Sequence, residues 1–277
     1  MLVKLTREEL QQRLKEALET WPLYRELSYE LLMNEVLLPK EISRLCEGCG
    51  TVKVWETRNQ FAPQTENNKR GLGEKQYTCK NCGKAGVTYY YYWKAIDAQT
   101  STFFKVGQYP MLEETVDPAL ENALASEDLK LYKKAIRLRN FNYGLGAVAY
   151  MRRVVENSMN DLLSVLHDAA EESDVSAEVL DKLTEVKNGR RFSEKIDYAA
   201  LLLTERLRPR GSPNPIELLH DLTSDSVHAR SEEECVDTFD ECDVAFQYLF
   251  SKLREEVKGK KQYRKVLSEL GKRRPIT

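Results

Sequence analysis

Two short cysteine motifs constrain this chain more than any other feature. Cys46–Gly50 and Cys79–Gly83 each read Cys-x-x-Cys-Gly. The glycine after each second cysteine permits a positive φ, so the backbone amides of the turn can point at the sulfurs. Four thiolates in two such pairs are the ligands that a tetrahedral structural zinc site requires. We therefore predict a structural Zn²⁺ ion, with no open coordination position, bound by Cys46, Cys49, Cys79 and Cys82.

The competing interpretations of these cysteines are a pair of disulfides and a redox-active dithiol. The N-terminal residues lack the long apolar segment of a secretory signal, and paired knuckles on β-hairpins are poor redox sites. No apolar run approaches the length of a membrane span. We expect a cytoplasmic protein with no membrane partner, in which the zinc interpretation is the favoured one.

The residues between the two motifs predict a zinc ribbon over 41–100. The 29 residues that separate Cys49 from Cys79 exceed the usual ribbon spacing, but the polar run 61–74 accounts for much of the excess as an extended hairpin tip. Short strands are expected at 52–55, 76–78 and 87–93. The aromatic residues Tyr89–Trp93 either form a stacking platform for bases or pack alternately into the protein, and ordinary strand chemistry favours packing.

Helical patterns surround the ribbon. Thr6–Glu9 forms a capping box before leucines spaced by four residues, and a second helical pattern from Leu23 to Leu32 completes a predicted hairpin over 1–40. A linker over 102–110 leads into a helical domain, predicted over 101–258. The sequences Asp117-Pro118 and Asn214-Pro215 pair an N-cap with proline at N1, and Ser231–Glu234 is a second capping box. Cys235 and Cys242, seven residues apart on one helix face, are expected as buried thiols.

Charge is distributed unevenly along the chain. The net charge is −2, but residues 258–277 hold eight basic residues and one acid. This basic C-terminal tail, 259–277, could bind nucleic acid or an acidic partner through residues such as Lys260, Lys261 and Arg264. The alternative is a solvated helix that ends in a frayed terminus.

Two segments carry a resemblance to a known family. With the four-cysteine ribbon before them, Lys105–Pro110 and Tyr143–Asn157 resemble bacterial proteins that join a zinc ribbon to a helical domain of unknown function, which also occurs appended to restriction enzymes. That domain is similar to the HEPN superfamily, whose members commonly dimerise and appear in RNA cleavage and phage defence. The resemblance implies a mostly α fold: a HEPN-like helical bundle with a small β zinc ribbon and an N-terminal helical hairpin. It also implies a homodimer.

The resemblance places a candidate site in Leu219–Ser231, which contains His220, His228 and Arg230. The superfamily's ribonucleases need an arginine four to six residues ahead of a histidine, and no arginine stands there before any of the three histidines. His228 and Arg230 are expected just before a helix N-terminus, where an anion is favoured. The alternative is that Ser231 simply caps that helix and the three acids after it use the dipole.

These observations favour a non-catalytic binding or sensing protein that engages nucleic acid, a nucleotide or a partner protein, with a role in phage defence. The first alternative is a divergent metal-independent ribonuclease that uses His228, with Arg230, Arg152 or Arg153 in place of the missing arginine. The second is an assembly adaptor whose ribbon docks a protein.

Overall fold

The computed structural model describes residues 3–30, 38–57, 64–66, 70–97, 100–122, 124–171, 177–189, 194–197, 199 and 211–272. It divides into two compact units. The first comprises residues 1–113 with 140–142 and is built on a β-sheet. The second comprises residues 114–139 with 143–277 and is helical. Each unit has its own hydrophobic core, so each is described separately.

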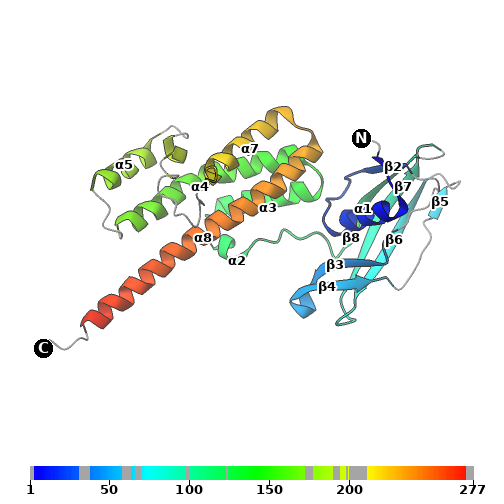
Figure 1. Ribbon diagram of the computed structural model, residues 1–277, viewed down its shortest axis with the longest axis horizontal. Helices are drawn as coiled ribbons and strands as arrows, with labels where there is room; N and C mark the ends of the chain where they lie inside the picture. The colour runs from blue at the N-terminus through cyan, green and yellow to red at the C-terminus, as the bar shows by residue number, and fades with distance from the viewer. Residues whose placement is uncertain are drawn as a thin grey trace. The chain divides into compact units, whose positions relative to one another are not determined.

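The first unit is a curled sheet that is antiparallel except for one parallel pair of strands (Figure 1). In the part of the chain that the structure describes, the strand order is β1-β2-β8-β7-β6-β4-β3, and β5 pairs with β6. The strands are β1 (Val3–Lys4), β2 (Leu27–Glu30), β3 (Glu41–Cys46), β4 (Thr51–Glu56), β5 (Gln64–Glu66), β6 (Arg70–Cys79), β7 (Gly86–Ala95) and β8 (Thr100–Tyr109).

Helix α1 (Arg7–Glu19) packs against one face of this sheet. The Thr6 hydroxyl accepts a hydrogen bond from the Glu9 amide and the Glu9 carboxylate accepts one from the Thr6 amide, which confirms the predicted capping box. Leu10, Leu14 and Leu18, spaced by four residues, are fully buried in the core. The opposite wall of that core consists largely of aromatic side chains from the strands: Tyr29, Trp55, Tyr77, Tyr89, Tyr91 and Phe103.

The predicted fold class is wrong. The cysteine motifs do not belong to a small ribbon beside a helical bundle, because β3, β4, β6 and β7 are members of the larger curled sheet. Nine registered residue pairs join β6 to β7, from Arg70↔Lys94 to Thr78↔Gly86. The sheet therefore makes up a full structural unit of the protein, with its own core.

Two segments that were predicted to lie outside any strand complete this sheet. Leu27–Glu30 was expected within the second helix of an N-terminal hairpin, but it forms β2 and pairs with β8, Leu27 opposite Phe103. The expected linker 102–110 falls almost entirely in β8. Strand pairing offers both segments a hydrogen-bonded partner that their local sequence does not reveal. The N-terminal helical hairpin is therefore also wrong in its second half.

The second unit is helical in the residues that the structure describes. Its helices are α2 (Pro118–Glu121), α3 (Ser126–Asn140), α4 (Gly144–Glu171), α5 (Ala177–Asn188), α7 (Pro215–Ala229) and α8 (Glu232–Lys272). The side chains of Asp117 and Asn214 accept hydrogen bonds from backbone amides of the helices that follow, as predicted. The Ser231–Glu234 capping box is also confirmed. Cys235 and Cys242 are buried in the core of this unit, as expected.

Helices α4, α7 and α8 pack against one another and form the centre of this unit. The first residue of α4 allows a close approach: a Cβ at Gly144 would lie 2.6 Å from the Val236 amide nitrogen and 2.7 Å from Cys235 Cβ. Arg139 of α3 adds a two-pronged ion pair with Asp240 of α8, with N–O distances of 2.7 and 2.6 Å. These contacts fix α8 against the rest of the unit.

In the part of the chain that is described, none of the helices has both the length and the apolar character that crossing a bilayer demands.

Candidate metal centre and a polar cluster on the helical unit

Each cysteine motif forms a tight turn closed by its glycine. In the first, a 3₁₀ turn over Glu47–Cys49 ends at Gly50, whose φ is 67° and whose amide donates to the Cys46 carbonyl at 2.8 Å. In the second, Gly83 has a φ of 64° and donates to the Cys79 carbonyl at 2.9 Å. A non-glycine residue rarely adopts this left-handed conformation, so the glycines are required by backbone geometry.

The two turns bring four sulfurs into one cluster. The Sγ atoms of Cys46, Cys49, Cys79 and Cys82 all lie within 4.8 Å of one another. Cys46 Sγ and Cys82 Sγ, from different motifs, are 3.7 Å apart. A tetrahedral zinc–thiolate centre with Zn–S bonds of about 2.3 Å separates its sulfurs by about 3.8 Å. All six cysteines of the chain are free thiols. The four predicted ligands therefore form a site that can hold a metal ion.

The thiols of this cluster differ in acidity. Backbone amides of Ala85 and Lys84 lower the pKa of Cys82 to about 6, whereas burial raises the pKa of Cys46 to about 12. The Asn81 side-chain amide donates a hydrogen bond to Cys49 Sγ at 3.2 Å. Metal binding must displace the Cys46 proton, so the affinity for a metal rises with pH.

The cluster lies beside a short join in the sheet. Strand β4 joins β6 through two registered pairs, Trp55↔Cys79 and Glu56↔Thr78. The first motif follows β3 and the second follows β6, so the sulfurs connect the β3–β4 hairpin to the centre of the sheet. Lys80 adds an ion pair with Glu41, whose N–O distance is 3.0 Å. A bound ion would thus hold together two parts of the sheet that share few backbone hydrogen bonds.

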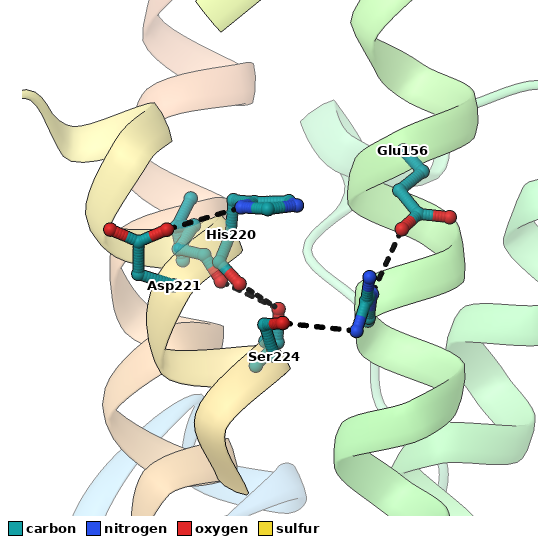
Figure 2. Close-up of polar contacts among 7 residues, drawn as sticks. Glu156, His220, Asp221 and Ser224 are labelled. Carbon is teal, nitrogen blue, oxygen red and sulfur yellow. Dashed lines mark hydrogen bonds and ion pairs between the residues drawn. The ribbon is translucent and has the colours of Figure 1, made fainter. Parts of the chain in front are cut away.

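Two of the predicted binding residues, Arg152 and His220, belong to a polar cluster between α4 and α7. Arg152 pairs with Glu156 at 2.9 Å and donates to the Ser224 hydroxyl at 3.1 Å. Figure 2 shows His220 beside Asp221 on α7, with its ring directed toward α4, where Glu156 lies. The His220 Nδ1 is 3.2 Å from an Asp221 oxygen.

This cluster carries no excess of positive charge, because each basic side chain has a carboxylate beside it. The Arg152 guanidinium faces the Glu156 carboxylate, and His220 faces Asp221. Such an arrangement suits hydrogen bonding between helices better than attraction of a phosphate, because no excess positive charge is present. Ser224 was not among the predicted residues, although its position four residues after His220 places it on the same side of α7.

His228 and Arg230 come just before the N-terminus of α8, as the sequence indicated. Helix α7 continues through Ala229, so His228 lies in its last turn and Arg230 is its C-cap. The Arg230 guanidinium donates to the Thr238 hydroxyl of α8, and this contact holds it against that helix. The His228 side chain lies outside the described residues. Arg153 is exposed on α4.

The remaining predicted binding residues lie in α8. Lys260, Lys261 and Arg264 fall within the continuous helix that runs to Lys272, although their side chains lie outside the described set. The predicted tail is therefore helical over 259–272. In the same segment, Tyr263 is 65% exposed and Val266 is 46% exposed.

The aromatic run of β7 packs alternately, as favoured from the sequence. Tyr89, Tyr91 and Trp93 are buried, and Tyr90 is 39% exposed. The buried rings face the core of the sheet unit, so the run as a whole does not form an exposed stacking platform.

No family model, curated protein or solved structure matches this chain.

Proposed function

We propose that this protein binds nucleic acid without catalysis through the C-terminal part of α8, and that the four-cysteine site holds Zn²⁺ in a structural role. The observation that supports binding is the composition of α8 over residues 258–272, a helical segment with six basic residues and one acid. Figure 1 shows this end of α8 extending past the other helices of its unit. A cationic helix that projects in this way offers an accessible surface to phosphates.

The exposed Tyr263 supports the same proposal. At about 100° per residue, positions 260, 261 and 264 fall on one side of α8, and position 263 borders that side. Basic residues that follow a phosphate backbone, next to an aromatic ring on which a base can stack, are the combination found in proteins that bind single strands. Val266 lies farther round the helix, away from the cationic side.

Zinc is the metal that the ligand set favours. Four cysteine thiolates and a sulfur–sulfur distance near that of a tetrahedral centre suit Zn²⁺ in a closed structural site. The six cysteines form no disulfide, which supports a location in the reducing cytoplasm. The resemblance at Tyr143–Asn157 supports a homodimer and a role in phage defence, both of which belong to this proposal.

The proposal is tested with metal-loaded protein and fluorescently labelled RNA, single-stranded and structured, by anisotropy over a salt series. Substitution of Lys260, Lys261 and Arg264 by glutamine should weaken binding to all sequences. It should also reduce the slope of log K against log salt by about 0.7 for each phosphate that is no longer neutralised. Tyr263→Ala should weaken binding by about 1–3 kcal/mol while the slope stays unchanged, because stacking releases no counterions.

The matched control carries the same loss of charge on another helix of the unit: Lys130, Lys133 and Lys134 of α3 replaced by glutamine. Equal affinity in the α8 and α3 variants would refute binding through α8. Absence of any complex would favour the assembly adaptor. Cleavage of RNA in EDTA that is lost in His228→Ala would instead establish the metal-independent ribonuclease.

A further inference from the structure

The outward face of the sheet, opposite the face on which α1 packs, carries aromatic side chains from two neighbouring strands. Successive residues of a strand point to opposite faces. In β7, Tyr89 and Tyr91 belong to the core that contains α1, so Tyr90 and Tyr92 lie on the outward face. Tyr90 is 39% exposed and Tyr92 is half-buried. The outward half of the aromatic run in β7 is therefore exposed in part.

Strand β8 extends this aromatic face. Phe104 lies opposite Tyr92 in the β7–β8 register, and the two ring centres are 5.3 Å apart. Tyr109 lies opposite Thr88, two residues from Tyr90 on the same face, and is 70% exposed. Four rings thus occupy neighbouring positions on two adjacent strands. We call them the outward aromatic surface: Tyr90, Tyr92, Phe104 and Tyr109.

A glycine lies beside the most central of these rings. The β7–β8 register shifts between Tyr90 and Tyr91, so that Gly107, rather than Val106, is opposite Tyr90. A Cβ built at Gly107 would lie 3.7 Å from Tyr90 Cδ2, which places the ring directly beside the glycine. A valine in that position would stand next to the ring and cover part of it. The register shift therefore keeps the Tyr90 ring open to a ligand.

Basic side chains follow the aromatic residues on the same face. Lys94 of β7 is exposed, and Arg70 of β6 lies opposite it. Glu66 of β5 is in register with Arg70 on its other side, so Lys94 is the cation that we assign to a ligand. Glu74 lies opposite Tyr90, where it would repel a phosphate. A phosphate is therefore favoured near Lys94, and a neutral ring system is favoured over the aromatic side chains.

We propose that the outward aromatic surface binds single-stranded nucleic acid, with unpaired bases stacked on its rings and the phosphate backbone beside Lys94. Exposed aromatic side chains on a sheet, next to a cation, are the combination with which proteins bind single strands. A duplex should not bind here, because its bases already stack on one another. This surface and the basic part of α8 belong to different units, so neither binding proposal depends on the other.

The test uses full-length, metal-loaded protein and a fluorescently labelled oligonucleotide, followed by anisotropy. The oligonucleotide is offered as single-stranded RNA, as single-stranded DNA and as a duplex with its complement. Stacking accepts either sugar, so both single strands should bind. Each measurement is repeated in a variant in which Lys260, Lys261 and Arg264 are replaced by glutamine, because this variant removes the contribution proposed for α8. It should still bind the single strands, and it should not bind the duplex.

Tyr90→Thr keeps a residue that favours strands and removes the ring. It should weaken binding of the single strands about 5-fold to 140-fold, the range for the loss of one stacked base, with and without the glutamine substitutions in α8. Its slope of log K against log salt should equal that of the parent. Lys94→Gln should instead reduce this slope by about 0.7, since one phosphate is no longer neutralised.

The matched control is Tyr143→Thr, which removes a 59% exposed tyrosine from the helical unit and should bind as the parent does. Photo-crosslinking of the parent to a strand that contains iodouracil gives a second readout, which does not require a variant to fold. Crosslinks should form on β7 or β8. The proposal is overturned if crosslinks form on α8 alone, or if Tyr90→Thr and Tyr143→Thr bind single strands equally. Weaker binding confined to the glutamine variant would then leave the α8 proposal standing.

Discussion

Gly144→Ala separates two physical effects that oppose each other at the start of α4. Helix propensity favours alanine over glycine by as much as about 1 kcal/mol in a helix interior, and by less in the first turn. The structure predicts the reverse, because the new methyl group would lie 2.6 Å from the Val236 amide nitrogen and 2.7 Å from Cys235 Cβ. Backbone atoms cannot rotate away, so α8 must shift to make room for the methyl group.

The shift would also disturb the bond from the Leu145 amide to the Glu232 carboxylate, now 2.9 Å long. Overpacking of this kind costs about 1–3 kcal/mol, and the loss of a charge-assisted hydrogen bond adds to it. We therefore expect Gly144→Ala to destabilise the helical unit by about 2–3 kcal/mol. Urea unfolding followed by far-ultraviolet circular dichroism measures this change.

Gly146→Ala provides the matched control, two residues further along the same helix. Its nearest obstacle is the flexible end of Leu138, 3.0 Å from the added Cβ, which can turn aside. This variant should be unchanged or slightly more stable than the parent, since propensity then decides the outcome. If Gly144→Ala proved as stable as Gly146→Ala, the close packing of α4 on α8 would be refuted.

Two further changes test the metal centre and a buried acid. Cys79→Ser should lower the metal content and unfold the edge of the sheet, while the helical signal in circular dichroism stays unchanged. The control variant Cys235→Ser should retain the metal. Unchanged metal content in Cys79→Ser would contradict the site. Burial raises the pKa of Asp243 above its usual value of 3.8. The contribution of protonated Asp243 to the free energy of unfolding is therefore complete below pH 3.8. It is lost as the pH rises through the raised pKa of Asp243 in the folded protein. The melting temperature of the parent minus that of Asp243→Asn should therefore fall over this range, and a difference independent of pH would exclude the effect.

The features that could be predicted from the sequence depend on short spacings. Cys46 and Cys49 approach each other because the turn between them is local. A glycine after each cysteine pair is sufficient to indicate that turn. The alternation of Tyr89, Tyr91 and Trp93 follows from the period of a strand. The capping residues Thr6 and Ser231 act within one helical turn, so their neighbours determine the outcome.

The features that could not be predicted depend on partners far along the chain. Leu23, Leu27 and Leu31 fit a helical period, but Leu27 pairs with Phe103, and no local signal indicates that partner. The sequence placed His228 just before a helix N-terminus but did not indicate that the preceding helix α7 continues through it to Ala229.

The pairing of β2 with β8 has a consequence for the order of assembly on the ribosome. The four cysteines have all been synthesised by residue 82, and β6 and β7 are neighbours in sequence as well as in the sheet. The metal site and this hairpin can therefore form on the growing chain through short-range contacts. Strand β2 is made earlier, but its antiparallel partner is made only at residues 100–109. Until then the registered partner of β2 is the two-residue strand β1, so one end of the sheet gains its main partner only after the cysteines at the other end have been brought together.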